Sequence, residues 1–288
     1  MSNLGKCIYC GADGVVAIAL RNRGMRNGYL CREHATNIGD HGYFTKNDKK
    51  RGELKKHGFT FGMEFECSRP TAELRAELEL CDFIPTQDST TDTEFKSPIW
   101  QSLNPLPKKF KTIECLLNEG YGAITEDEGT HFHVGHVDYI NAETIQYLRR
   151  FYHSLFIPLS NIMEEYEENT EKLFGRKFSY WADSINERTD ATEHRNFINL
   201  QHNHTIEFRI CKFKSAEQYM GAVKFCKDAT NAIINNFIKH FNDDQSDDVK
   251  VRAKVSKFKN VREYRLHKAK ITANKLVELF KKYAEVNE

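Results

Sequence analysis

Three short segments of the sequence carry polar side chains two residues apart, of types that bind metals and phosphate. The pairs are Glu64 and Glu66 in FGMEFEC, His131 and His133 in GTHFHVG, and Glu207 and Arg209 in TIEFRIC. Because side chains alternate across a β-strand, each pair would project from one face while the phenylalanine between them points to the other. One sheet face would then gather carboxylates, imidazoles and a guanidinium. This combination suits Mg²⁺ and phosphate, because carboxylate oxygens bind the metal and the planar arginine fork binds phosphoryl oxygens.

The residues around the paired positions alternate in the manner of half-buried strands. In FTFGMEFEC, four apolar side chains alternate with Thr60, Gly62 and the two acids, and TIEFRIC shows the same pattern. For any single pair, an amphipathic strand with a solvated face is the better explanation. Three coincident pairs, with histidine among them, favour a functional site, and we expect its acids to lie on an open face of the sheet.

The segments between these strands have helical spacing, so the sequence predicts an α+β fold. We expect five helical regions. They cover residues 71–83, a segment that starts after Pro107 and ends near Gly120, 138–174 with an interruption or kink at Pro158, a segment from Ser215 to about Phe241, and 270–286. The segment TEFKSP predicts one more strand, which carries Glu94 and ends at Pro98.

The polar motifs also occur in an order that resembles a known family. The motifs GMEFE, DSTTDTEFKSP, GTHFHVG, RNFINL and TIEFR follow one another between Phe59 and the helix after Lys214. In this order they resemble the phage and bacterial amidoligase family, a branch of the glutamine synthetase and glutamate–cysteine ligase superfamily. The resemblance spans most of the chain and implies a curved antiparallel sheet of glutamine-synthetase type with flanking helices.

The resemblance implies an ATP-dependent ligase that joins a carboxylate to an amine through an acyl phosphate. The implied ligands of Mg²⁺ or Mn²⁺ are Glu64, Glu66, Glu94, His131 and Glu207. It also implies that His133 and Asn199 contact ATP, and that Arg209, helped by Arg195, neutralises the transferred phosphoryl group. Glu64 is expected to take part in catalysis as well. The carboxylate substrate would belong to an amino acid, a peptide or a protein.

Four potential zinc ligands near the N-terminus form a separate motif. Cys7 and Cys10 make a CxxC pair, and Cys31 and His34 make a CxxH pair after a turn-rich stretch. Two such pairs match the spacing of a closed Cys₃His tetrahedral site, so we expect a structural Zn²⁺ within residues 1–40. A redox CxxC is an alternative, although redox chemistry would not require the second pair.

Length and charge fit a cytoplasmic enzyme with more than one part. The chain has 288 residues and a formal net charge of +1, which does not indicate a nucleic-acid or membrane partner. No segment resembles a membrane span or a signal peptide, so we expect a location in the cytoplasm, that of the host for a phage protein. We expect a linker over 41–57, a catalytic domain over 58–242, and a basic segment with a terminal helix over 243–288.

Two stretches outside the motifs are candidates for contacts with ligands or partners. The aperiodic loop 175–195 carries Arg176, Lys177, Tyr180 and Trp181, which suit an anionic or planar ligand. Residues 249–271 are dense in lysine and arginine. A solvated face is the usual explanation of such a run, and recognition of an acidic protein, a polyanion or nucleic acid is the functional one.

Three other functions fit parts of the sequence. A metal-dependent hydrolase would use the HxH motif with carboxylates. A nucleic-acid- or protein-binding protein would use the zinc module and the basic segment, with the sheet as a scaffold. A catalytically inactive relative would keep the fold, but every acid, histidine and arginine of the strand motifs is present. The combined motifs favour the ATP-dependent ligase.

Overall fold

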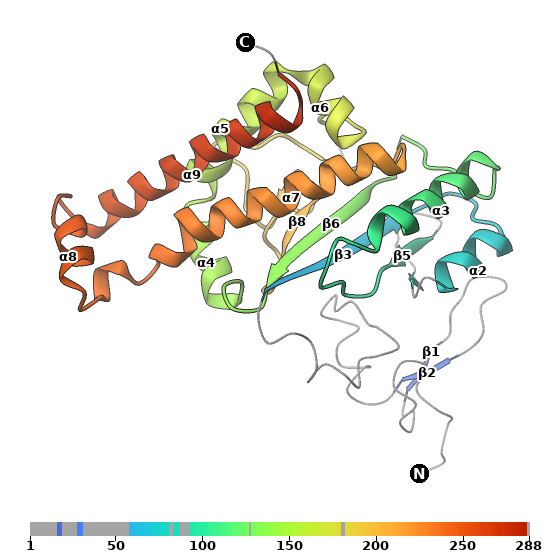
Figure 1. Cartoon of the computed structure of the whole chain (residues 1–288), viewed down its shortest axis with the longest axis horizontal. Helices are drawn as coiled ribbons and strands as arrows, with labels where there is room; N and C mark the ends of the chain where they lie inside the picture. The colour runs from blue at the N-terminus through green and yellow to red at the C-terminus, as the bar shows by residue number, and fades with distance from the viewer. Residues whose placement is uncertain are drawn as a thin grey trace. The chain divides into compact units, whose positions relative to one another are not determined.

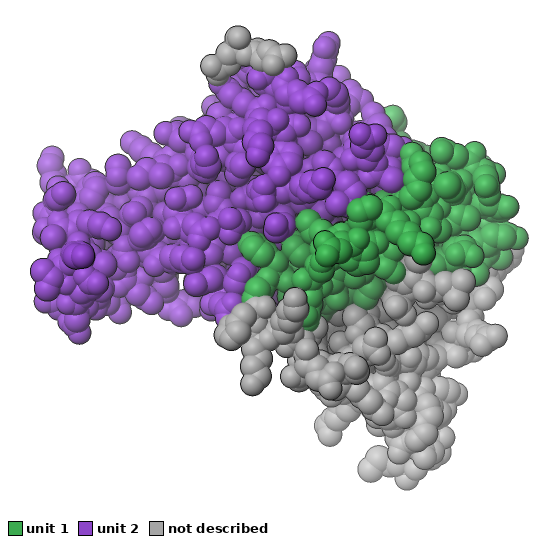
Figure 2. All heavy atoms as spheres, in the orientation of Figure 1, with its two compact units in different colours: residues 1–130 green, residues 131–288 purple. Residues whose placement is uncertain are grey.

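The segments that carry the paired polar residues form strands, as their alternation predicts. They are β3 (Phe59–Glu66), β6 (Thr130–His136) and β8 (Ile206–Phe208). A computed structural model describes residues 16–18, 28–30, 58–80, 83–86, 93–126, 128–179 and 182–286. The chain divides into two compact units, unit 1 (residues 1–130) and unit 2 (residues 131–288), which Figure 2 colours separately. Each unit has helices and antiparallel strands, so the predicted α+β class is confirmed.

In unit 1, three strands form an antiparallel ladder in the order β4 (Ile84–Thr86), β5 (Glu94–Lys96) and β3. The strand expected in TEFKSP is therefore present as β5. Phe65 lies opposite Phe95 with ring centroids 6.4 Å apart, and both side chains are buried. Helix α2 (Ala72–Leu80) buries Leu74 and Leu78 on one stripe and packs against β4 and α3 (Leu106–Asn118). These apolar contacts fix the strands that carry the acids.

A two-stranded antiparallel hairpin lies nearer the N-terminus of unit 1. Strand β1 (Val16–Ile18) pairs with β2 (Gly28–Leu30), and Val16 is the partner of Leu30. The chain therefore enters β1 and leaves β2 at the same end of the ladder. The predicted zinc ligands Cys7, Cys10, Cys31 and His34, and the predicted linker 41–57, lie outside the described residues.

In unit 2, β8 lies between β6 and β7 (Ile198–Asn199) in an antiparallel ladder. Phe132 is paired with Phe208, and Tyr219 of α7 (Ala216–Asn236) contacts Phe132 edge to face with centroids 6.4 Å apart. The apolar face of this ladder is thus buried against α7. His133 and Glu207 alternate with these residues, so they point to the other face.

Five further α-helices complete the described part of unit 2. They are α4 (Ala142–Arg150), α5 (Tyr152–Glu165), α6 (Glu167–Phe174), α8 (Val249–Val255) and α9 (Val261–Tyr283). Helix α9 packs along α5 and α7, as the red, green and orange ribbons of Figure 1 show. Gly175 ends α6 with φ +80°, and a Cβ there would lie 2.1 Å from the Lys212 carbonyl oxygen. Only glycine at position 175 allows the end of α6 to pass so close to the backbone at Lys212.

The predicted interruption at Pro158 is wrong, while a kink there stays a prediction. The helical region 138–174 breaks instead at Phe151 and Tyr166, and Pro158 lies inside α5. A proline inside a helix costs about 3 kcal/mol. Burial of Leu155, Phe156 and Leu159 on the same helix offsets this cost.

The C-terminal helices also differ from the expectation. Ser215 caps α7 by accepting a hydrogen bond from the Gln218 amide at 3.1 Å, as the sequence predicts, but α7 ends at Asn236 and short 3₁₀ turns follow. Helix α9 begins nine residues before the expected position, at Val261, because Asn260 caps it by accepting from the Glu263 amide at 2.9 Å. Within the described residues, no helix has both the length and the apolar composition of a membrane span.

Candidate functional site

The strand register of unit 2 aligns three polar residues in one row. His133 of β6 is the partner of Glu207 on β8, and Glu207 is the partner of Asn199 on β7. Directly opposed residues of antiparallel strands project from the same face. All three are buried, with exposed fractions of 1 to 2%. The face opposite the apolar core therefore carries a buried polar row.

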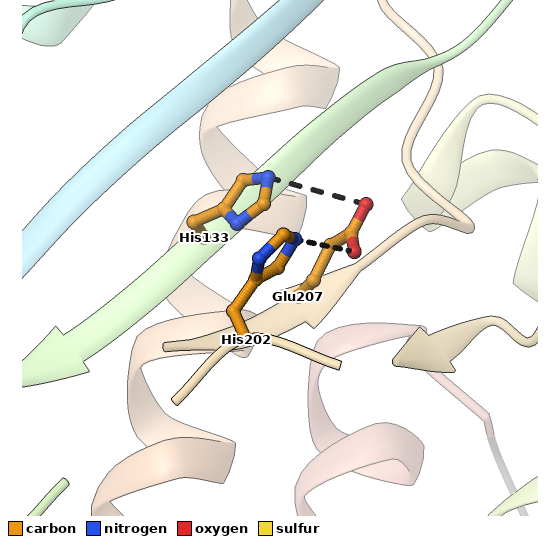
Figure 3. A group of neighbouring side chains, drawn as sticks. All are labelled: His133, His202 and Glu207. Atoms are coloured by element: carbon orange, nitrogen blue, oxygen red, sulfur yellow. Dashed lines mark ion pairs between the residues drawn. The ribbon is translucent and has the colours of Figure 1, made fainter. Parts of the chain in front are cut away.

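Glu207 is the centre of a cluster of charged and imidazole groups. Its Oε1 accepts a hydrogen bond from Arg209 Nη1 at 2.7 Å and lies 3.5 Å from His131 Nδ1. Its Oε2 lies 3.5 Å from His202 Nε2, and His133 Nε2 lies 4.0 Å from Oε1 (Figure 3). We call these five residues the Glu207 cluster. One carboxylate thus faces three imidazoles and one guanidinium.

The Glu207 cluster holds its carboxyl group in the charged state. Burial by itself would raise the pKa of Glu207, because a charged group loses hydration. The Arg209 guanidinium, and after it His202, His133 and His131, outweigh burial and hold the pKa well below its usual range. An ionised carboxylate is the form that binds a metal ion.

Three members of the cluster converge in a way that fits a metal ion. Ligand atoms of His133, His202 and Glu207 all lie within 4.8 Å of one another. His133 Nδ1 lies 3.4 Å from the Thr205 hydroxyl, which leaves Nε2 directed toward Glu207. Such a hydrogen bond on the second nitrogen orients a metal-binding imidazole. Two imidazoles with one carboxylate suit Mn²⁺, Fe²⁺ or Zn²⁺ better than Mg²⁺.

Sequence reasoning missed His202. It belongs to the turn QHNHT, which leads directly into β8, so its proximity in sequence to Glu207 was an available signal. Arg149 of α4 fixes this turn by donating to the Leu200 carbonyl at 2.9 and 2.6 Å and to the Gln201 carbonyl at 2.9 Å. The position of His202 thus depends on an arginine 53 residues away in the chain.

Arg209 lies immediately after β8 and is only 7% exposed. Its Nη1 binds Glu207, whereas its buried Nε has no hydrogen-bond partner among the described residues. A buried donor without a partner is unfavourable by about 1–3 kcal/mol. The guanidinium therefore has a donor in reserve for a ligand oxygen.

The acids of unit 1 form a second group, and the expectation of an open face for them is wrong. Glu64, Glu66 and Glu94 are each 6% exposed. Lys96 Nζ lies 3.1 Å from Glu64 and 3.4 Å from Glu94. Burial alone would lower the pKa of Lys96, but these two carboxylates raise it to about 12. The ammonium group thus supplies the positive charge that two buried acids need.

Glu66 has a different environment from the other two acids. One of its oxygens accepts a hydrogen bond from the Gly129 amide at 2.5 Å. Glu128, which immediately precedes Gly129 in the chain, is also buried. Its carboxylate accepts hydrogen bonds from the Ser68 hydroxyl and the Thr125 amide. Backbone and hydroxyl donors therefore stabilise carboxylates at this edge of unit 1. The expectation that Glu64, Glu66 and Glu94 share one site with His131 and Glu207 stays a prediction.

The remaining candidates from the sequence have local partners. Arg195 pairs with Glu193 at 3.5 Å and is partly exposed. The Asn199 amide donates to the Glu193 carbonyl at 3.2 Å and accepts from the Gln201 amide at 2.6 Å, so this side chain closes a loop. In the loop 175–195, Arg176 is buried and Lys177 pairs with Glu167 at 3.3 Å. Tyr180 and Trp181 lie outside the described residues.

Comparisons of the chain with family models, with curated proteins and with solved structures find no match. The functional argument therefore depends on the residues of the two polar groups and on their geometry.

Proposed function

We propose that this protein is an ATP-dependent carboxylate–amine ligase, which forms an amide through an acyl phosphate. The proposal also keeps a sheet of glutamine-synthetase type and a cytoplasmic location, where ATP is available. The observation that carries it is the buried pair of Glu207 and Arg209 beside three imidazoles. A carboxylate for a metal ion and a guanidinium for phosphate lie together, away from water.

Each residue of the Glu207 cluster has a role in this proposal. Arg209 binds an oxygen of the transferred phosphoryl group through its reserve donor, while Nη1 stays on Glu207. His133 would contact the nucleotide phosphates through the metal ion that it would hold. Asn199 assists from β7, and Arg195 assists from the loop before β7. The substrate carboxylate attacks the γ-phosphorus, the bond to ADP breaks, and an amine then displaces phosphate from the acyl group. This chemistry needs positioning and neutralisation of charge more than proton transfer.

The donor sets fit the metals that the proposal requires. Glu207, His133 and His202 would hold Mn²⁺ or a related ion, with His131 beside them, and the three acids of unit 1 would hold Mg²⁺. A bound metal supplies positive charge for the phosphate oxygens and for the developing negative charge of the transition state.

A screen for ADP release tests the proposal directly. The protein is incubated with ATP, Mg²⁺ or Mn²⁺, and a matrix of amines with amino acids and peptides, and products are identified by mass spectrometry. We expect at least one pair to give equal amounts of ADP and an amide. Absence of Mg·ATP or Mn·ATP binding in calorimetry, with folded protein, would contradict the ligase.

A metal-dependent hydrolase is the second candidate, and one observation favours it. The arrangement of two imidazoles and one carboxylate in His133, His202 and Glu207 resembles the ligand set of catalytic zinc sites. Such an enzyme would be active with Zn²⁺ or Mn²⁺ in the absence of ATP. Hydrolysis of amide or ester substrates without ATP therefore distinguishes it from the ligase.

Replacement of Lys96 tests whether the acids of unit 1 bind a metal. We expect Lys96→Met to raise Mg²⁺ affinity by about tenfold or more, because a positive charge near 4 Å repels a cation by a few kcal/mol. Calorimetric titration with Mg²⁺ measures the change. The matched control is Lys111→Met, which removes an exposed lysine paired with Glu114 at 2.6 Å. If Lys96→Met only lowers thermal stability and leaves Mg²⁺ affinity unchanged, Lys96 and the acids form a structural ion-pair group.

The zinc motif remains a proposal and has its own test. Purified protein is expected to carry one Zn²⁺ per chain, held by Cys7, Cys10, Cys31 and His34. Cys10→Ser should lose the metal, because the site is then left with three of its four ligands and binds zinc far less tightly. Elemental analysis measures the ratio, and Cys115→Ser serves as the control because Cys115 is an exposed free cysteine. Metal-free wild-type protein would contradict the motif.

A further inference from the structure

A pocket in unit 2 gathers three arginines. It has a volume of about 470 Å³ and lies between the junction of α4 with α5 and the beginning of α9. Its cationic lining comes from Arg150, Arg262 and Arg265, to which His153 adds an imidazole. Phe151, Val261 and Leu266 supply an apolar part. We call this the arginine pocket. Its volume lies within the range of pockets that hold small organic groups.

Two of the three arginines are available to a ligand. Arg150 and Arg262 are exposed, and neither side chain has an ion pair or hydrogen bond within the described residues. Arg265 is held in place, since it donates to the Phe241 carbonyl at 3.3 Å and lies 5.4 Å above the Tyr147 ring. His153 is also fixed, with Nε2 2.7 Å from the Thr189 carbonyl oxygen. The pocket thus combines fixed and available cationic groups.

Four of the residues that line the pocket belong to a strongly basic part of the chain. Residues 249–270, in α8 and the first half of α9, contain nine lysines and arginines and one acid, Glu263. The carboxylate of Glu263 accepts a hydrogen bond from the Lys259 backbone amide at 2.7 Å. Arg252 pairs with the carboxylate of Asp247 at 2.5 Å. Because the whole chain carries a net charge of only +1, this charge is concentrated in one region.

We propose that the arginine pocket and the basic residues 249–270 bind nucleic acid through its backbone phosphates. The arginine fork binds phosphate oxygens in a bidentate manner, and the exposed lysines of α8 and α9 would contact neighbouring phosphates. The apolar lining from Phe151, Val261 and Leu266 suits a sugar or base next to the phosphate held by the arginines. This surface is independent of the ligase proposal, because none of its residues belongs to the Glu207 cluster or to the acids of unit 1.

Nucleic acid fits these observations better than an acidic protein. Cations at intervals of two or three residues along α8, α9 and the segment between them suit a repeating row of phosphates. A concave pocket accepts a single nucleotide unit, so single strands are expected to bind more tightly than duplex. Positively charged grooves with an aromatic side chain are typical of single-strand binding.

Fluorescence anisotropy with full-length protein tests the proposal. The probes are labelled single-stranded DNA, single-stranded RNA and duplex DNA of equal length, each measured over a series of salt concentrations. The test variant is Arg150→Glu/Arg262→Glu, and the control is Lys224→Glu/Lys275→Glu, which makes the same charge change elsewhere in unit 2. Lys275 is 13 residues beyond Arg262 on α9, about 20 Å along the helix.

We expect the test variant to weaken single-strand binding at least tenfold, and the control variant to change it less than threefold. The slope of log K against log salt should fall by about 1.4, since two lost phosphate contacts contribute about 0.7 each for single strands. Arg262→Gln alone gives a milder test, and circular dichroism verifies that each variant is folded. No wild-type binding at low salt, an equal loss in both double variants, or equally tight binding of polyglutamate would overturn the proposal.

Discussion

Arg209→Lys is expected to lower turnover by about 10²–10³-fold, the usual loss when one donor to a developing charge is removed. Lysine keeps the positive charge beside Glu207 but has no planar fork. A lysine ammonium can contact either Glu207 or the phosphoryl oxygen. Arg209 can contact both, because its Nη1 donates to Glu207 and its buried Nε is left to donate to the phosphoryl oxygen. Because the second contact is made mainly in the transition state, ATP affinity should change only a few fold.

The measurement for Arg209→Lys is kcat and KM from ADP release, with the amine and carboxylate that the screen identifies. Arg188→Lys is the matched control, since Arg188 is an exposed arginine in the loop before β7. Unfolding by denaturant verifies that the variant keeps its fold. Wild-type turnover in Arg209→Lys would mean that Arg209 has a structural role, and Arg195 would become the candidate for phosphate binding.

The parts of the fold that the sequence predicts best are those with strict alternation. β3, β6 and β8 alternate between phenylalanines and polar residues, so the sequence places His133 and Glu207 on one face and Phe132 and Phe208 on the other. The register of β6 with β8 cannot be derived from alternation alone, because it depends on which apolar pairs meet α7. The structure supplies that register, and with it the row of His133, Glu207 and Asn199.

The parts that were missed depend on contacts distant in sequence. The sequence places His202 only five residues before Glu207, but His202 joins the Glu207 cluster because Arg149 of α4, distant in the sequence, holds its turn. The strand predicted in TEFKSP contains Lys96, but this lysine lies between Glu64 and Glu94 only because β3 and β5 pair in the observed register. Pro158 also depends on tertiary contacts, because the buried apolar side chains of α5 outweigh the tendency of proline to end a helix. Sequence pattern fixes which face a residue takes, whereas tertiary pairing decides its partners.

Glu207→Gln is expected to abolish metal binding by the Glu207 cluster. An amide keeps the shape of the side chain but loses its charge. Replacing a residue that only hydrogen-bonds a metal ligand lowers metal affinity by up to about 100-fold, so the loss of Mn²⁺ affinity on replacing the ligand itself should be larger. In wild-type protein, Mn²⁺ at 100 times its dissociation constant should stabilise the fold by about 2.7 kcal/mol. This stabilisation should be absent from Glu207→Gln. Thermal unfolding with and without Mn²⁺ measures it, and Glu193→Gln is the control because Glu193 also pairs with an arginine but is exposed.

The same variant separates the metal role of Glu207 from its ion pair. Glu207→Gln leaves Arg209 as a buried charge without a carboxylate, which should destabilise the metal-free protein by about 3–5 kcal/mol. The double variant Glu207→Gln/Arg209→Gln removes both charges, so we expect much of that stability to return while Mn²⁺ binding stays lost. Denaturant unfolding of wild-type protein, the two single variants Glu207→Gln and Arg209→Gln, and the double variant gives the coupling energy. If Glu207→Gln still binds Mn²⁺ with wild-type affinity, the pair of Glu207 and Arg209 is structural only, and the metal site must lie elsewhere in the chain.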